Sequence, residues 1–217
     1  MGCLFSGHAY LPSHPAIPDE THAFPATAYI AMAQPGDLIL VKSRGPIYSV
    51  GRRLTGNRYD HIAVLLDKQE TLNIVRPRAI LLSVRTLFKP RNTPLILRPQ
   101  WRNARQCEDF VLAMRAFSGI AYDVRKTLRG ILYSLLHTWF AIRIPMPKSH
   151  ISSSRWICTE AIIVTLCLTF PEFKAIDSLT LDYNRLGFAT TNDFLRIAGQ
   201  LPDVLQVVIP EQPRHLR

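Results

Sequence analysis

Two side chains in this sequence have the type and the setting that nucleophilic chemistry needs, and the first is Cys158. It follows three serines, 152–154, whose oxygens make good N-caps, and it lies in an apolar run over 156–168 that has the length of a helix. A thiol in the first turn of a helix faces unpaired backbone N–H groups, which stabilise the thiolate. The spacing therefore predicts a reactive cysteine, although a cysteine in an apolar helix is more often a small core residue.

The second side chain is His61, which begins an apolar stretch over 61–66 that reads as a buried strand. This position lets the imidazole project at the edge of a sheet. A histidine beside Tyr59 and Asp60 often does no more than bond a neighbour. If the fold brings Cys158 and His61 together, their chemistry would be acyl transfer, with the cysteine as nucleophile and the histidine as its base.

The other elements must bring these two residues together. The prolines, histidines and alanines of 1–34 predict an N-terminal tail or arm, and the turn signal at Pro35 begins one domain over 35–217. Strands come first and helices later, which is typical of an α+β fold. We expect strands at 38–41, 61–66, 71–75, 79–84, 95–98 and 204–209, and helices at 47–54, 107–117, 124–142, from about 153 to 168, and 194–199.

Composition narrows the class of protein. A chain of 217 residues with 47% hydrophobic residues forms one globular domain. The net charge of +10 favours an anionic partner such as a membrane surface, but no zinc-finger spacing or aromatic-basic cluster points to specific nucleic-acid binding. The cysteines show no paired spacing, which predicts a reducing, cytoplasmic setting without a metal or other cofactor. They are Cys3, Cys107, Cys158 and Cys167.

The first six residues fit a lipidation pattern. Gly2 stands at the acceptor position for N-myristoylation with Ser6 in place, and Cys3 would then be a candidate for palmitoylation. Two acyl chains would hold the protein stably on a membrane, where one holds it only marginally. The alternative is a chance match to a short pattern. No apolar run in the sequence has the length of a membrane span.

Five short motifs in order resemble the circularly permuted branch of the NlpC-type papain-like superfamily, which includes YiiX-like proteins and, more distantly, relatives of lecithin:retinol acyltransferase. Residues 35–39 (PGDLI) resemble its first strand, and 59–64 (YDHIAV) its histidine strand. Residues 119–123 (GIAYD) resemble its Gly-x-x-Tyr-Asp element, and 156–160 (WICTE) the start of its cysteine helix. Residues 191–195 (TNDFL) resemble a helix start near its C-terminus.

The resemblance implies a papain-like fold, in which an antiparallel sheet or small barrel packs against helices and the cysteine lies at a helix N-terminus. It also implies a third polar residue, on the strand after the histidine strand, that orients the imidazole. Asn73 is our choice because its amide oxygen accepts a hydrogen bond from an imidazole N–H. Arg76 is the alternative in the sequence, and it has no acceptor to offer.

The resemblance leaves three functions open. The first choice is an amidase or peptidase with Cys158, His61 and Asn73 as catalytic residues. The second is a lipid-directed acyltransferase, thioesterase or phospholipase, which the apolar segment 128–142 would suit, although such a segment is more often a buried helix. The third is a binding protein that keeps the fold without full activity. The expected partners are accordingly a peptide, amide or acyl-lipid substrate and an anionic membrane surface.

Overall fold

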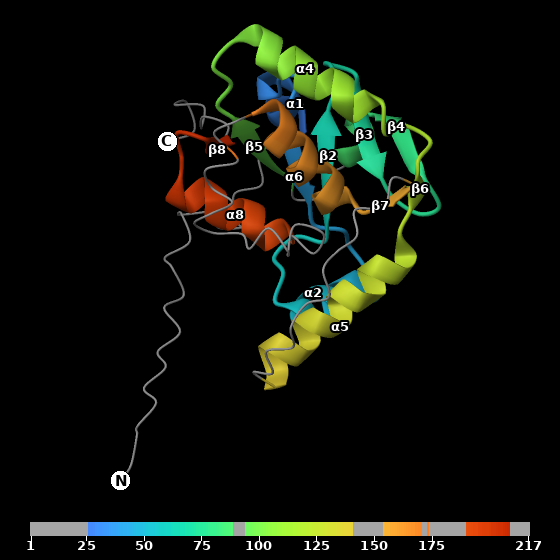
Figure 1. Cartoon of the computed structure of the whole chain (residues 1–217). Coiled ribbons are helices and arrows are strands. Elements are labelled where there is room, and N and C mark those ends of the chain that lie inside the picture. Colours follow the sequence, from blue (N-terminus) through green and yellow to red (C-terminus); the bar gives the residue numbers. More distant parts are fainter. Residues whose placement is uncertain (1–25, 89–93, 141–153, 171–172, 174–189, 209–217) are drawn as a thin grey trace.

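A six-stranded antiparallel sheet lies at the centre of the molecule (Figure 1). The structure is a computed structural model and describes residues 26–88, 94–140, 154–170, 173 and 190–208. Along the sheet the strands follow the order β4-β3-β2-β1-β5-β8. Their bounds are β1 (Leu38–Val41), β2 (His61–Leu65), β3 (Glu70–Ile74), β4 (Ala79–Ser83), β5 (Leu95–Pro99) and β8 (Leu205–Val208). Two further strands, β6 (Ala121–Tyr122) and β7 (Arg155–Trp156), pair in parallel beside this sheet.

The central strands are apolar on both faces, which explains their unbroken hydrophobic runs. In β1, Leu38 and Leu40 belong to one buried cluster, while Ile39 and Val41 belong to the other. Successive side chains of a strand point to opposite faces, so a strand covered on both sides has no polar alternation.

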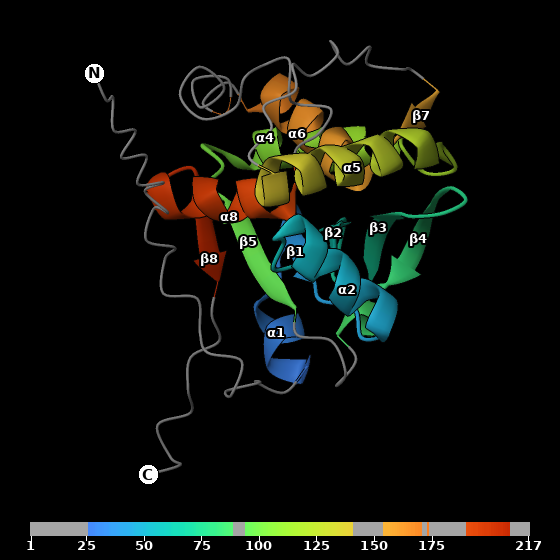
Figure 2. The same cartoon turned by 90° about the horizontal axis from the view of Figure 1, so that it is seen from below.

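Helices cover the two faces unequally. The larger core lies under α4, α6 and α8, and the smaller core under α1 and α3; Figure 2 shows the first three on one side of the sheet and α1 on the other. The helices are α1 (Ala26–Met32), α2 (Pro46–Thr55), α3 (Val84–Leu87), α4 (Ala104–Arg115), α5 (Val124–Phe140), α6 (Cys158–Thr169) and α8 (Thr191–Gln200). None of those described is long and apolar enough to cross a membrane.

The α+β class and the antiparallel sheet packed against helices are as predicted. The expected strands and helices match those observed to within a few residues over the described ranges. One difference concerns the N-terminal arm, because Tyr29, Ile30 and Met32 of α1 pack against the smaller core. The segment 26–34 is therefore part of the packed body, whereas Gly2 and Cys3 lie outside the described residues.

A buried ion pair holds the start of β1. The Asp37 carboxylate is 1% exposed and accepts hydrogen bonds from the Arg98 guanidinium at 2.8 and 2.9 Å and from the Gln34 backbone N–H at 2.8 Å. Arg98 also donates to the Met32 carbonyl at 2.7 Å. Burial raises the pKa of Asp37, and the hydrogen bonds with Arg98 and Gln34 oppose that shift. The pair ties the segment between α1 and β1 to β5, the strand beside β1 in the sheet.

We expect Arg98→Met to lower the free energy of unfolding by about 3 kcal/mol, because it leaves the Asp37 carboxylate buried without its cation. The measurement is equilibrium unfolding in urea near neutral pH. Arg115→Met is the matched control, since Arg115 pairs with Asp67 and Glu70 at a side-chain exposure of 43% and should cost less than about 1 kcal/mol. Equal losses in the two variants would contradict the structural role given to Asp37.

Candidate active site

The start of α6 lies against β2 and brings Cys158 to His61. Cys158 is the first residue of α6, and the N-cap is Ile157, which has an extended backbone. The expected cap at Ser153 or Ser154 was wrong. The reason is that Arg155–Trp156 are drawn into β7, paired with β6, and this extended pair delays the helix until Cys158.

The helix start still offers the cysteine what the sequence predicted. The Cys158 sulfur accepts hydrogen bonds from the backbone N–H groups of Thr159, in the first turn of α6, and of Ile62 in β2. Strand β2 pairs with β3 at Val64 and Leu65, and this pairing does not extend to Ile62. Because Ile62 is not paired with β3, its backbone N–H is available to donate to the Cys158 sulfur.

Cys158 and His61 are hydrogen-bonded through their side chains. Burial acts against both charges, raising the pKa of Cys158 and lowering that of His61. The hydrogen bond and the attraction between the two groups outweigh it, so that the pKa of Cys158 falls below its ordinary value and the pKa of His61 rises above its own. The arrangement favours a thiolate beside an imidazolium.

Asn73, and not Arg76, is the third polar residue that the structure brings to the imidazole. The Asn73 Oδ1 lies 3.2 Å from His61 Nε2, and the Asn73 side chain is buried at 2% exposure. Arg76 follows the end of β3 and is exposed to solvent. Since Nε2 bonds Asn73, the other nitrogen, Nδ1, is left to exchange the proton with Cys158.

Thr71 fixes which way the Asn73 amide points. The Thr71 hydroxyl donates to the Leu82 carbonyl of β4 at 3.0 Å, so its oxygen accepts from the Asn73 amide nitrogen at 2.9 Å. The Asn73 oxygen must then face His61, where it accepts from Nε2–H. This chain of bonds selects the tautomer in which Nδ1 is free to act as a base.

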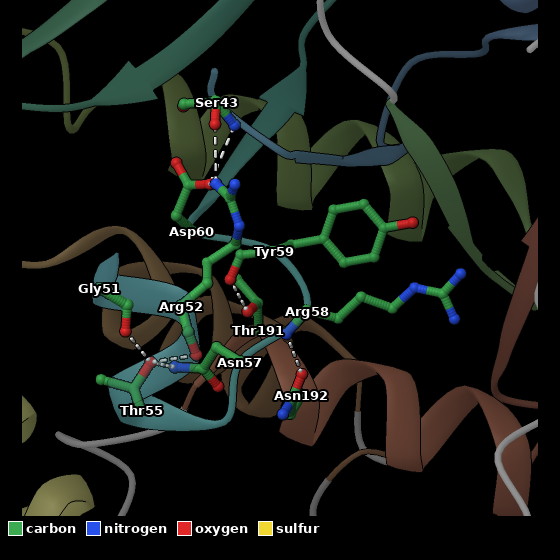
Figure 3. A network of polar contacts seen from close by, with 10 residues as sticks. All are labelled: Ser43, Gly51, Arg52, Thr55, Asn57, Arg58, Tyr59, Asp60, Thr191 and Asn192. Carbon is green, nitrogen blue, oxygen red and sulfur yellow. Dashed lines mark hydrogen bonds and ion pairs between the residues drawn. The ribbon is translucent and has the colours of Figure 1, made fainter. Parts of the chain in front are cut away.

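The loop that leads into His61 is held by polar contacts from two other segments (Figure 3). The Asp60 carboxylate accepts from the Ser43 backbone N–H at 2.9 Å and pairs with Arg52 of α2. At the start of α8, the Thr191 hydroxyl donates to the Tyr59 carbonyl at 2.6 Å. The residues 191–195 that resembled a family motif thus belong to the support of the histidine.

A second chain of contacts supports the cysteine. Glu160 is fully buried in the first turn of α6, where its carboxylate pairs with Lys126 of α5 and accepts from the Ile157 backbone N–H. Burial raises the pKa of Glu160, and Lys126 opposes the shift. The carboxylate completes half of a capping box, because the Ile157 side chain has no oxygen to return the bond.

Sequence reasoning missed three residues of this site. Thr71 and Lys126 gave no signal, since both lie outside the five motifs. Tyr122 lay in a quoted motif without a role, and the structure places it near Cys158: burial, followed by the cysteine's negative charge, raises its pKa to about 12. The Tyr122 hydroxyl is hydrogen-bonded to that of Thr127 at 3.0 Å.

Among the described residues, no group of three or more His, Cys, Asp or Glu side chains is arranged to hold a metal ion.

No protein-family model matches the chain, and no curated protein matches it. One similar solved structure is that of the metalloprotein YiiX from Escherichia coli O157:H7, at 12% identity, TM-score 0.48, and coverage of 83% of this chain and 98% of that one. A likeness of this degree carries no argument, so the family resemblance stays a prediction.

We expect Thr71→Val to move the pH profile of Cys158 alkylation to higher pH and to slow the reaction at neutral pH about tenfold. Without the hydroxyl, the Asn73 amide is free to turn its NH₂ toward Nε2. That orientation disfavours imidazolium, lowers the pKa of His61 and raises the pKa of Cys158. The rate with iodoacetamide, followed by mass spectrometry, gives the profile.

Thr71→Ser keeps the hydroxyl and should keep the wild-type profile. Thr165→Val is the matched control, because Thr165 is also buried and bonds only a carbonyl of its own helix. If Thr71→Val changes the thermal unfolding midpoint but leaves the pH profile where it was, Thr71 has no part in orienting the imidazole.

Proposed function

We propose that this protein is a cysteine hydrolase that acts by acyl transfer through a thioester on Cys158, most simply as an amidase or peptidase. The observation that carries the proposal is the hydrogen bond between Cys158, at the first position of α6, and His61, whose other nitrogen is held by Asn73. We further propose that the fold is papain-like with a permuted order, since the histidine precedes the cysteine along the chain.

The chemistry starts from the buried ion pair. The Cys158 thiolate attacks the carbonyl carbon, and the electron pair of the C=O bond moves to the oxygen. When the tetrahedral intermediate collapses, His61 gives its proton to the leaving group and a thioester remains on the sulfur. Water, deprotonated by His61, then attacks the thioester and releases the acid and the thiol.

The developing oxyanion needs donors. The Cys158 backbone N–H lies in the first turn of α6, where N–H groups have no acceptor within the helix. We propose it as one donor. The Tyr122 hydroxyl is our candidate for a second donor, because the charge of Cys158 contributes to its raised pKa.

An amide substrate makes a specific demand on His61. An amine leaves a tetrahedral carbon only after it has been protonated, whereas an alkoxide or a thiolate leaves more readily. An imidazole held in its cationic form has the proton in place for that step. A lipid-directed acyltransferase, thioesterase or phospholipase uses the same two residues and remains the second candidate.

We expect Cys158 to react with iodoacetamide well below the pH at which an ordinary thiol does. The thiolate is present above the lowered pKa of Cys158 and disappears as the pH falls through that value. Cys107 provides the internal comparison, since burial raises its pKa to about 11, and Cys167, buried in the same helix, provides another. Mass spectrometry of digests locates the label at each pH.

His61→Ala should remove the advantage of Cys158 over the other two thiols, and Cys158→Ala should remove the fast label altogether. With p-nitroanilide and p-nitrophenyl ester substrates, a burst of product and an acyl group on Cys158 in the intact mass would establish the thioester. Faster turnover of the esters only would favour the lipid-directed candidate. Alkylation of Cys158 no faster than that of Cys167 would instead assign the chain to binding proteins.

A further inference from the structure

Helix α5 exposes a row of large apolar side chains to solvent. Leu128 is 61% exposed, Leu132 57% and Ile131 38%. Positions three and four apart lie on one face of a helix, so the three side chains form a single patch along about one turn. In the sequence this segment favoured a buried helix, whereas the structure buries its opposite side, at Lys126.

Basic side chains flank this apolar row. Arg125 and Arg129 are exposed and lie one turn apart on the same side of α5 as Leu128 and Leu132. Helix α2 packs against α5 (Figures 1 and 2). It exposes Val50 and Arg53.

Neither helix contains an acidic residue, and their five cations divide into two groups. Arg52 and Lys126 pair with Asp60 and Glu160 inside the molecule. Arg53, Arg125 and Arg129 are exposed. The surface thus combines an apolar row with a positive border, and α2 and α5 themselves contribute no acidic side chain to it.

We propose that the exposed face of α5, formed by Leu128, Ile131 and Leu132 with Arg125 and Arg129, docks on the surface of an anionic phospholipid membrane. Apolar side chains on one face of such a helix enter the boundary between headgroups and acyl chains. Arginines at the border of that face lay their stems along the apolar surface and reach the lipid phosphates with their guanidinium groups. The attraction to anionic lipid adds to the apolar burial.

The place of α5 in the fold gives this docking a consequence for the site. Lys126 ties the first turn of α5 to Glu160, in the first turn of α6, two residues from Cys158. Membrane binding through α5 would therefore hold the cysteine close to the lipid surface. The docking itself rests on exposure and charge, and it stands whether or not Cys158 is a nucleophile.

The test measures co-sedimentation of the full, unacylated chain with sucrose-loaded vesicles of phosphatidylcholine and phosphatidylserine in equal parts, and with phosphatidylcholine alone. We expect binding to the mixed vesicles that weakens as salt rises. The double variant Leu128→Ser with Leu132→Ser should bind at least about tenfold more weakly, because two exposed leucines no longer enter the lipid. Arg125→Gln with Arg129→Gln should lose the preference for phosphatidylserine.

The chain offers a matched control in Leu112 of α4 and Leu168 of α6, which are 70% and 72% exposed on other helices. Leu112→Ser with Leu168→Ser should bind like the wild type. Equal losses in the two leucine pairs, or no binding of the wild type, would overturn the proposal. A third result would also overturn it: the wild type and the leucine variant bind poly-glutamate, and the arginine variant does not. That result would assign the face to an acidic protein partner.

All variants alter exposed residues, and unchanged thermal unfolding midpoints would show that they fold. Alkylation of Cys158, measured on the same variants without vesicles, should not change. A loss of membrane binding with normal alkylation therefore separates this proposal from the one made for the site.

Discussion

The hydrogen bond between a thiol and an imidazole, both withdrawn from water, is the interaction around which this structure is organised. Burial penalises each charge when it stands alone, and it strengthens the attraction between the two charges when they form together. The balance depends on backbone donors from Ile62 and Thr159 at the sulfur and on an acceptor from Asn73 at the imidazole. Small displacements of either residue would leave two neutral groups in place of an ion pair.

Because the sulfur and the imidazole must be held at a fixed separation, polar side chains anchor the loops and helix starts around the site. The loop before His61 is fixed by Asp60 from one side and by Thr191 of α8 from the other (Figure 3). The start of α6 is fixed by Glu160 and Lys126. Each anchor joins segments distant in the chain, so the separation between sulfur and imidazole is set by tertiary contacts and not by local propensity.

Sequence patterns predicted the elements well and the anchors poorly, for a physical reason. The strand at Leu38 and the helix after Cys158 could be predicted because both are buried. Buried elements of this kind appear in the sequence as apolar runs. Asn73 was predicted through the resemblance, but its competition with Arg76 could be judged only once β3 was placed against β2. Lys126 contacts Glu160 across 34 positions, and no local pattern records such a contact.

The cap of α6 shows the same limit on a smaller scale. Three serines are good N-caps by propensity, yet the helix begins later because Arg155–Trp156 pair with β6. That pairing makes Cys158 the first residue of the helix, ahead of which Ile157 supplies no oxygen to compete for the first N–H groups. A serine cap at position 157 would direct its oxygen at the same donors that the sulfur uses. The apolar residue at that position leaves the helix start to the Cys158 sulfur and to Glu160.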